Sequence, residues 1–507
     1  MMRKRLTAAL LLLTTVMLAS CSFITWRGPE PAETDAPVTE ADTDRPVETA
    51  DAGTTAAVTE AEDRPSVRPV ETVDYRPIAE ACLDALPDWD FGGIAITLVT
   101  ADNTPFAPEL TGDIIPNSRI ERNGMVEKKY NTKILVKTAD IDTIWQDLRL
   151  AVEADDYYAD LLGIGQTEIG RFQAARLLMN MLSLPFTDYT APYFHQAAMK
   201  QLTSEYVQYG AVGAYNETLD YLYGLFFNRT LAEKLELDPY GAVYGDEWDY
   251  DAFRRMTKKA NGNVDGRIVA GHGSSLGIDT YTDLLFAGSG IDLVQCGWGK
   301  KPVLGYGAVS AGDSAADRVT AALRRLLYTD KTVWSDSRGA YTADGAMEAF
   351  CEGGMLFYTD RLYFTSWIAD MRDNWGLLPF PTADGSYHTY CDLSMPILCA
   401  PADSTNSEYT GLFLQAANAA SYGWLTDVYY ENLQINVVRD SDTLNMLDRI
   451  CGRTNSATVY SYASFFGSRY PYIADATYLA IRSAVRDNFT ASSYYTLHSS
   501  VSLTPNR

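Results

Sequence analysis

The sequence has little positive charge for its size. Its 507 residues contain 41 Lys and Arg against 66 Asp and Glu, which gives a formal net charge of −25 at pH 7. Nucleic acids and anionic surfaces are bound by clusters of basic residues, whereas acidic residues clearly outnumber basic ones in this chain. We therefore expect no nucleic-acid partner, and the acidity mainly favours solubility.

Residues that hold metals or cofactors are also scarce. The four histidines are scattered and the seven cysteines include no Cys-x-x-Cys pair, so neither a zinc site nor a redox motif has support. We expect no metal and no cofactor. The cysteines after Cys21 are irregularly spaced, which leaves their pairing open and favours buried free thiols. They are Cys82, Cys296, Cys351, Cys391, Cys399 and Cys451.

Catalytic motifs are weak or absent. The chain contains no His-Glu-x-x-His helix and no Walker loop, and Gly288-Ser289-Gly290 is only a fragment of a Gly-x-Ser-x-Gly nucleophile elbow. Asp155 and Asp156 are neighbours in sequence, whereas the two carboxylates of a glycoside hydrolase face each other across a cleft. We expect no catalytic residues and a protein that is not an enzyme.

The N-terminus carries a targeting signal. Basic residues at positions 3–5 precede an apolar run at 6–18, and small residues close that run before Cys21. This pattern predicts a secretory signal peptide over residues 1–20. The last four letters, Leu-Ala-Ser-Cys, resemble the bacterial lipobox, whose cysteine is acylated with a lipid such as palmitate. We expect a lipid anchor at Cys21 on the outer face of the cell membrane, with an uncleaved anchor helix as the alternative.

The remainder divides into a tether and a large folded part. Residues 21–76 comprise the lipidated cysteine and a stretch rich in Thr, Ala, Glu, Asp and Pro, which cannot bury enough apolar surface to offset its ordering entropy. We expect a disordered acidic tether there. About 430 residues follow, more than one hydrophobic core usually encloses, so at least two lobes are expected.

The first part of the folded region alternates strand and helix patterns. Apolar, β-branched runs at 94–100, 133–137 and 159–164 predict strands, with helices expected around 125–130 and over 141–154. This rhythm is typical of an open, doubly wound α/β lobe, in which ligands lie beyond the carboxyl ends of the strands. The rule selects Asp102, Asn103 and Gln166 as ligand contacts.

A second lobe is expected further along the chain. The segment 343–350 reads as a helix, Gly353-Gly354 ends it, and a short strand at 355–358 leads to Asp360 and Arg361. The segment 375–381 is extended and closed by prolines, which predicts a crossover between lobes. The glycine-rich stretch 271–307 is expected to be irregular.

Taken in order, these pieces resemble the family 1 extracellular solute-binding proteins, which include maltose-binding-protein-like receptors of sugar importers. Arg229 stands where the family usually has lysine. The matching segments are Phe227-Asn228-Arg229, Asp246 to Phe253, Ala287 to Gly290, Ala346 to Met355, Gly376 to Pro381 and Asp440 to Ile450.

The resemblance implies an α/β, two-lobed periplasmic-binding-protein-like fold of type II. Each lobe would be an open mixed sheet flanked by helices, with the ligand cleft between the lobes. Lobe 1 would comprise 88–210 plus about 376–428, and lobe 2 about 211–375 plus 429–507. The implied partners are the permease subunits of an ABC importer in the membrane, and the protein itself is expected to be a monomer.

The resemblance also places ligand contacts on the second lobe. Tyr358, Asp360 and Arg361 end a strand at the cleft, and Trp367 could supply a stacking ring that Arg361 displaces. Trp298, flanked by glycines, is a further candidate. With 33 tyrosines and nine tryptophans the chain suits carbohydrate stacking, although Arg361 leaves open a ligand with a carboxylate. The predicted ligand contacts are Asp102, Asn103, Gln166, Trp298, Tyr358, Asp360, Arg361 and Trp367.

Two other functions fit the same features. A lipid-anchored extracellular glycoside hydrolase would share the compartment, the aromatic content and the acidity. A ligand-binding sensor lipoprotein would share the fold but present its ligand to a receptor. The sequence favours the solute-binding component of an ABC importer over both.

Overall fold

The computed structural model describes residues 74–216, 219–291, 294–304, 315–369, 371–383, 385–436, 441–451, 457–459 and 481–487. The predicted signal peptide, Cys21 and nearly all of the tether lie outside these ranges. All the elements below belong to the unit Pro69–Arg507. Within the described residues, every helix is too short or too polar to cross a membrane.

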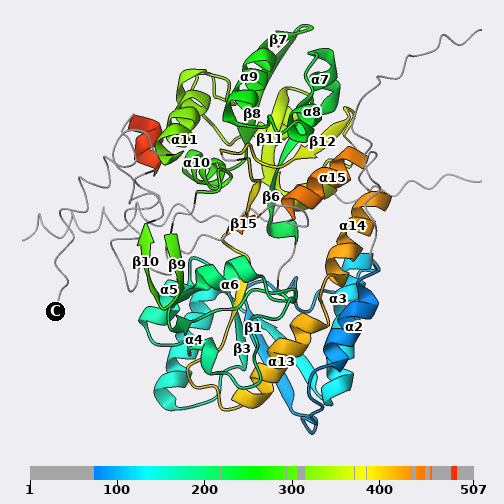
Figure 1. Cartoon of the computed structure of the whole chain (residues 1–507), viewed down its shortest axis with the longest axis vertical. Helices are drawn as coiled ribbons and strands as arrows, with labels where there is room; N and C mark the ends of the chain where they lie inside the picture. Colours follow the sequence, from blue (N-terminus) through cyan, green and yellow to red (C-terminus); the bar gives the residue numbers. More distant parts are fainter. Residues whose placement is uncertain are drawn as a thin grey trace, which may run out of the picture. The chain divides into compact units, whose positions relative to one another are not determined.

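The first sheet carries four strands in the order β14-β3-β1-β2, of which β1 and β3 are labelled in Figure 1. β1 is parallel to β2 and β3, whereas β14, which comes from far along the chain, is antiparallel to β3. β1 is almost wholly buried because its apolar side chains are covered on both faces. The strands are β1 (Ala95–Thr100), β2 (Lys133–Thr138), β3 (Leu161–Gly165) and β14 (Pro396–Cys399).

Helices cover this sheet to form what we call lobe 1. The Asp140 carboxylate accepts the Thr143 amide and so begins α4 at Ile141. α4 packs on β1, and α13 packs on β1, α2 and α3. The helices are α2 (Arg76–Asp84), α3 (Ile114–Tyr130), α4 (Ile141–Ala154), α5 (Ile169–Ala174), α6 (Gln196–Leu202) and α13 (Ser407–Ala419).

The second sheet carries five strands in the order β12-β6-β11-β8-β7 and is the centre of lobe 2. β11 is central, parallel to β8 and antiparallel to β6. The strands are β6 (Tyr223–Asn228), β7 (Gly262–Val264), β8 (Arg267–Ser274), β11 (Met355–Arg361) and β12 (Trp375–Leu378).

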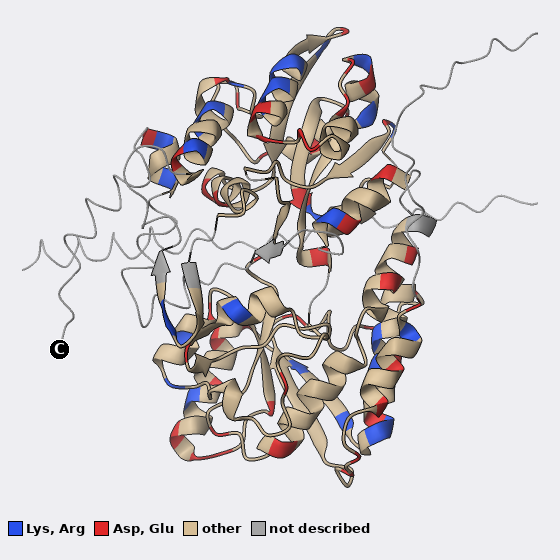
Figure 2. Cartoon of the chain, in the orientation of Figure 1, with Lys and Arg blue, Asp and Glu red and all other residues tan. Residues whose placement is uncertain are grey.

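Lobe 2 is also flanked by helices. The fully buried Trp248 precedes α9, donates its indole N–H to the Pro379 carbonyl at 2.9 Å and packs on Phe357 of β11. The helices are α7 (Arg229–Lys234), α8 (Pro239–Tyr244), α9 (Tyr250–Ala260), α10 (Ile278–Ala287), α11 (Ala315–Arg324), α12 (Ala346–Cys351) and α15 (Ser441–Ile450), with the π-helix η3 (Arg325–Thr329) after α11. Lys and Arg are interspersed with Asp and Glu on the helices (Figure 2).

Smaller elements complete the chain. A third sheet has the order β10-β9-β4-β5, and β13 pairs with β15. The bounds are η1 (Met181–Ser183), β4 (Thr203–Glu205), β5 (Val207–Gln208), η2 (Leu219–Tyr221), β9 (Val294–Trp298), β10 (Lys300–Leu304), η4 (Leu362–Ser366), β13 (His388–Tyr390), α14 (Trp424–Asn436) and β15 (Ala457–Val459). None of the six cysteines after Cys21 is joined in a disulfide within the described residues, and Cys296, Cys391 and Cys399 are buried.

The predicted fold class, two mixed sheets each flanked by helices, is confirmed. The expectation that 271–307 is irregular is wrong, because this stretch holds the end of β8, α10, β9 and β10. Its glycines serve packing: a side chain at Gly271 would collide with the Thr257 carbonyl of α9. Trp375–Leu378 forms β12 in the sheet of lobe 2, and Phe380, Tyr387 and Tyr390 still pack in the core of that lobe before β14 joins the first sheet.

Candidate functional site

The carboxyl end of β1 presents Asp102 to the segment that leads from lobe 1 to lobe 2. The Asp102 carboxylate accepts the hydroxyl of Tyr221, which lies in η2 on that segment, and the Thr104 amide at 2.9 Å. Burial, followed by the hydrogen bond to Asp102, raises the pKa of Tyr221 well above its usual value. The phenol therefore stays protonated and donates at neutral pH. Asn103 instead turns its side-chain amide to the Ala107 carbonyl at 3.4 Å.

The carboxyl end of β3 presents Gln166, which is fully buried. Its backbone N–H donates to the Leu393 carbonyl at 2.9 Å, and its side-chain amide donates to the Asp392 carbonyl at 3.2 Å. Gln166 thus holds the turn that precedes β14, and this turn contains Asp392.

Asp392 joins the two lobes and was missed in the sequence. Its carboxylate accepts the hydroxyl of Tyr223, the first residue of β6, at 2.7 Å, and lies 4.0 Å from the guanidinium of Arg361 at the end of β11. The Ser394 amide also donates to it at 2.8 Å. The spacing Asp-x-Ser before an apolar strand is the signal of an Asx turn that could have pointed to this residue.

The carboxyl end of β11 holds Tyr358, Asp360 and Arg361, as the sequence predicted. The ring of Tyr358 is fully buried between Phe350 and Phe364, with ring centroids 5.4 and 4.8 Å away. Tyr358 is therefore a core ring whose hydroxyl reaches the site and donates to Asp360 at 2.7 Å. Burial raises the pKa of the Asp360 carboxyl, although hydrogen bonds from Tyr358 and from the Arg361 amide oppose this.

Ser275, between β8 and α10, extends this cluster. Its hydroxyl lies 2.7 Å from that of Tyr358. The stretch Gly273-Ser274-Ser275-Leu276-Gly277 matches the complete Gly-x-Ser-x-Gly pattern, which the sequence reasoning overlooked. A nucleophile elbow places its serine on a strained turn beside a base. Ser275 has no positive φ, and its partner phenol has a pKa that burial raises, so the hydroxyl is not activated as a nucleophile.

The two predicted tryptophans lie elsewhere. Trp367 follows η4 and is 61% exposed, and Tyr363 within η4 is 50% exposed. Trp298 is 63% exposed and lies at the end of β9, where its ring packs edge-on against Tyr206 at 5.2 Å. Trp298 therefore belongs to the third sheet rather than to the cluster at the ends of β1 and β11.

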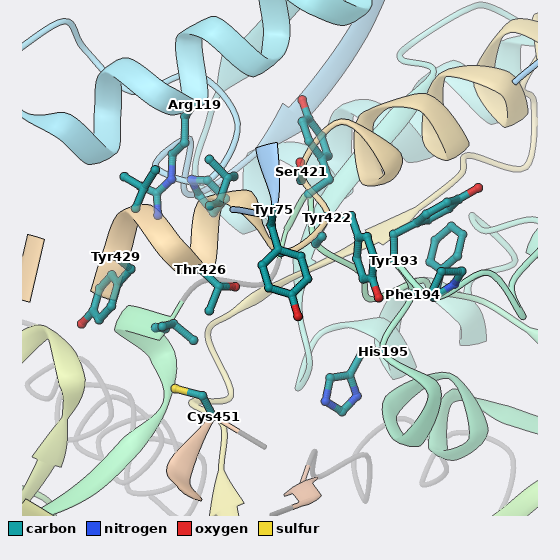
Figure 3. A pocket seen from close by; sticks show the side chains of 18 of the residues that line it. Tyr75, Arg119, Tyr193, Phe194, His195, Ser421, Tyr422, Thr426, Tyr429 and Cys451 are labelled. Atoms are coloured by element: carbon teal, nitrogen blue, oxygen red, sulfur yellow. The ribbon is translucent and has the colours of Figure 1, made fainter. Parts of the chain in front are cut away.

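A pocket of about 360 Å³ is lined by Arg119, by tyrosines and by Leu219, which lies in η2 with Tyr221 (Figure 3). Arg119 of α3 stands in its wall, only 6% exposed, donating to the Thr104 carbonyl at 3.2 Å and lying 3.9 Å from the Asp220 carboxylate. Burial lowers the pKa of Arg119, and the nearby Asp220 opposes that shift. The aromatic walls are Tyr75, Tyr193, Phe194, Tyr215, Tyr422 and Tyr429.

The eight residues predicted as ligand contacts are not among those that line this pocket. The sequence reasoning missed Arg119 because it lies in the middle of a helix rather than at a strand end. The pocket combines aromatic rings with a guanidinium and hydroxyl groups, and its volume falls at the lower end of the range for small-molecule sites. Such walls can hold a compact, hydroxyl-rich ligand.

No protein-family model and no curated protein matches the sequence. Solved structures do match in fold. The cyclo/maltodextrin-binding protein complexed with maltotetraose is 15% identical, with 81% of this chain and 98% of that chain covered and a TM-score of 0.52. The maltose-binding periplasmic protein MalE of Listeria monocytogenes, in complex with maltose, is 12% identical, with coverages of 81% and 97% and a TM-score of 0.51. UspC of M. tuberculosis is 13% identical, with coverages of 80% and 98% and a TM-score of 0.50. The chain therefore has the two-lobed fold of the maltose-binding-protein-like solute-binding proteins.

Proposed function

We propose that this chain is an extracytoplasmic solute-binding protein that captures a carbohydrate where its two lobes meet. The observation that carries the proposal is a series of polar contacts that joins the lobes: Asp102 on lobe 1 accepts the Tyr221 hydroxyl, the Tyr221 carbonyl accepts the Asp392 amide, and the Asp392 carboxylate contacts Arg361 on lobe 2. Two proteins of the same fold were solved with maltotetraose and maltose. A ligand that touches both ends of this series would favour the closed arrangement of the lobes.

The charges in this region support a neutral ligand. The carboxylates of Asp102, Asp220 and Asp392 lie near the guanidinium groups of Arg119 and Arg361, and Asp360 adds a fourth carboxyl. Carboxylates accept hydroxyl groups and repel other carboxylates. We therefore infer a neutral, hydroxyl-rich ligand rather than an acidic sugar, with the tyrosine-lined pocket holding one or two of its rings.

The remaining parts of the proposal concern location and partners. The signal peptide and the lipobox-like Cys21 support lipid anchoring on the outer face of the membrane, with the tether giving reach. Delivery to the permease subunits of an ABC importer follows from the resemblance to the family. We propose no catalytic role, because in the described part of the chain the Ser275 hydroxyl contacts the Tyr358 phenol rather than a base, and the carboxyls at the site are held by tyrosine hydroxyls.

A thermal-shift screen tests ligand binding. The purified folded part should be incubated with maltose, maltotetraose, glucuronic acid and glucosamine, because a ligand that binds the native state alone must raise the melting temperature. We expect a neutral oligosaccharide to raise it and glucuronic acid to leave it unchanged. Stabilisation by glucuronic acid alone would contradict the inferred ligand charge.

Calorimetry on Arg361→Ala then tests the site. A charged group that donates to a ligand hydroxyl contributes about 1.5 to 3 kcal/mol, and Arg361 is partly exposed, so we expect roughly tenfold weaker binding of the neutral ligand. Arg338→Ala is the matched control, since Arg338 pairs with Asp336 on the surface of the loop before α12. Unchanged affinity in Arg361→Ala would remove Arg361 from the site, and release of shorter sugars would favour a glycoside hydrolase instead.

A further inference from the structure

We infer that the hairpin of β9 and β10, here called the strap, is a releasable clasp between the two lobes. The strap lies in sequence between α10 and α11, whose side chains pack in the core of lobe 2 with Phe357 of β11. Its own strand β9, however, pairs with β4, which lies beside lobe 1. The strap therefore links the lobes at a place separate from the polar contacts of Asp102 and Asp392.

The attachment of β4 to lobe 1 is well defined. Asn180 accepts the Gln208 amide at 3.0 Å and donates to the Tyr206 carbonyl at 3.2 Å, which holds both sides of the β4–β5 turn. The residues after β5 continue onto the first sheet, where Ala211 bridges Leu398 of β14. A strand that pairs with β4 is therefore attached to lobe 1.

The contact between strap and lobe 1 includes a strand pairing, a thiol hydrogen bond and an aromatic pair. β9 is parallel to β4 with Ser204 opposite Gly297, and the Gly299 amide donates to the Glu205 carbonyl. The Cys296 thiol is 9% exposed and donates to the Gln201 carbonyl of α6 at 2.8 Å. Trp298 lies edge-on against Tyr206 at 5.2 Å with an interplanar angle of 85°.

The exposed aromatic pair in this contact suits reversible release. Both rings of the aromatic pair are 63% exposed, so their contact is stabilised by edge-to-face packing rather than by deep burial. When the lobes open about the segments that connect them, either β4 moves with the strap or β4 separates from β9. Asn180 holds the β4–β5 turn on lobe 1, and Ile291, three residues before β9, packs against the core of lobe 2, so opening separates β4 from β9.

Loss of the aromatic pair should therefore favour the released strap. Such pairs contribute enough that their removal shifts the equilibrium about two- to tenfold. The consequence for ligand release rests on the proposed function, because a clasp that must open before the lobes separate slows dissociation of a solute. The clasp itself is a property of the chain without ligand and can be tested alone.

Cys296 provides a native reporter of release. Pulsed alkylation with iodoacetamide, followed by mass spectrometry of the Cys296 peptide, measures how often its thiol leaves the groove beside α6. We expect slow modification in the unmodified chain and about two- to tenfold faster modification in Trp298→Ala. Tyr206→Ala removes the other ring and should have the same effect.

Two controls separate the clasp from general loosening. Cys399 is fully buried in β14 of lobe 1, and its rate should stay unchanged in every variant. Trp89→Ala removes a comparable partly exposed aromatic pair, in which Trp89 contacts Phe186 at 5.4 Å and 61°. In this variant the Cys296 thiol should still be alkylated slowly.

The outcomes distinguish the two proposals. Equal rates at Cys296 in Trp298→Ala and in the unmodified chain, or a parallel increase at Cys399, would overturn the clasp. The clasp would also be overturned if the Cys296 thiol of the unmodified chain were alkylated as fast as in guanidinium chloride. Failure of every sugar in the thermal-shift screen would count against carbohydrate binding while leaving the alkylation result in place.

Discussion

His272 should make the stability of lobe 2 fall in mild acid. Its imidazole is fully buried on β8, next to the strand that carries the Asp360 end of the site, and packs on Phe253 at 5.5 Å. Nδ1 lies 2.9 Å from the Tyr281 hydroxyl and Nε2 lies 3.4 Å from the Leu326 carbonyl. The neutral ring can satisfy both contacts, donating to the carbonyl and accepting the hydroxyl, so burial lowers the pKa of His272 to about 4.

The size of the effect follows from that pKa. An unfolded histidine titrates near its ordinary value of about 6.5, and each unit of pKa difference corresponds to about 1.36 kcal/mol. The difference therefore corresponds to about 3 kcal/mol of stability. Because the folded pKa is the lower one, this stability is present above pH 6.5 and is lost as the pH falls from 6.5 towards 4. The buried Asp283, whose pKa burial raises to about 6, acts in the opposite direction.

A comparison with a variant isolates the histidine. The free energy of unfolding in urea should be measured between pH 7.5 and 4.5 for the unmodified chain and for His272→Gln. We expect His272→Gln to be less stable at pH 7.5 but to lose about 2 to 3 kcal/mol less on acidification. His195→Asn, which replaces a partly exposed imidazole that caps α6, is the control and should keep the original pH dependence. Equal acid losses in His272→Gln and the unmodified chain would refute the reasoning.

Three further predictions concern stability and anchoring. Trp248→Phe leaves the Pro379 carbonyl without its donor and creates a cavity, so urea unfolding should show a loss of about 2 to 4 kcal/mol. Tyr223→Phe removes the hydroxyl that Asp392 accepts, and the same assay should show a loss of about 2 kcal/mol, with no change arguing that the contact forms only weakly. Cys21→Ser should release the protein from membranes with binding intact, which fractionation and blotting of cells would show, whereas membrane retention would contradict the lipobox interpretation.

Local patterns in the sequence were sufficient for much of the fold. β1 and α4 were predicted almost to the residue, because an unbroken apolar run and apolar residues at helical spacing are properties of neighbouring residues. The strand that ends at Asp360 and Arg361 was predicted for the same reason. The length of the folded part was enough to predict at least two lobes, and the order of the segments carried the resemblance that implied an α/β fold for both.

Tertiary structure alone decided how the site is assembled. Asp392 contacts Tyr223, and Gln166 binds the turn that contains Asp392, over separations of 169 and 226 residues that no local pattern encodes. Arg119 lies in the middle of α3, and its place in the pocket wall depends on the packing of α14 against that helix. The pairing of β9 with β4 likewise joins segments that are far apart in sequence and have no shared signal. Periodicity reports which face of an element is buried, whereas the partner on that face is selected by the packing of the whole chain.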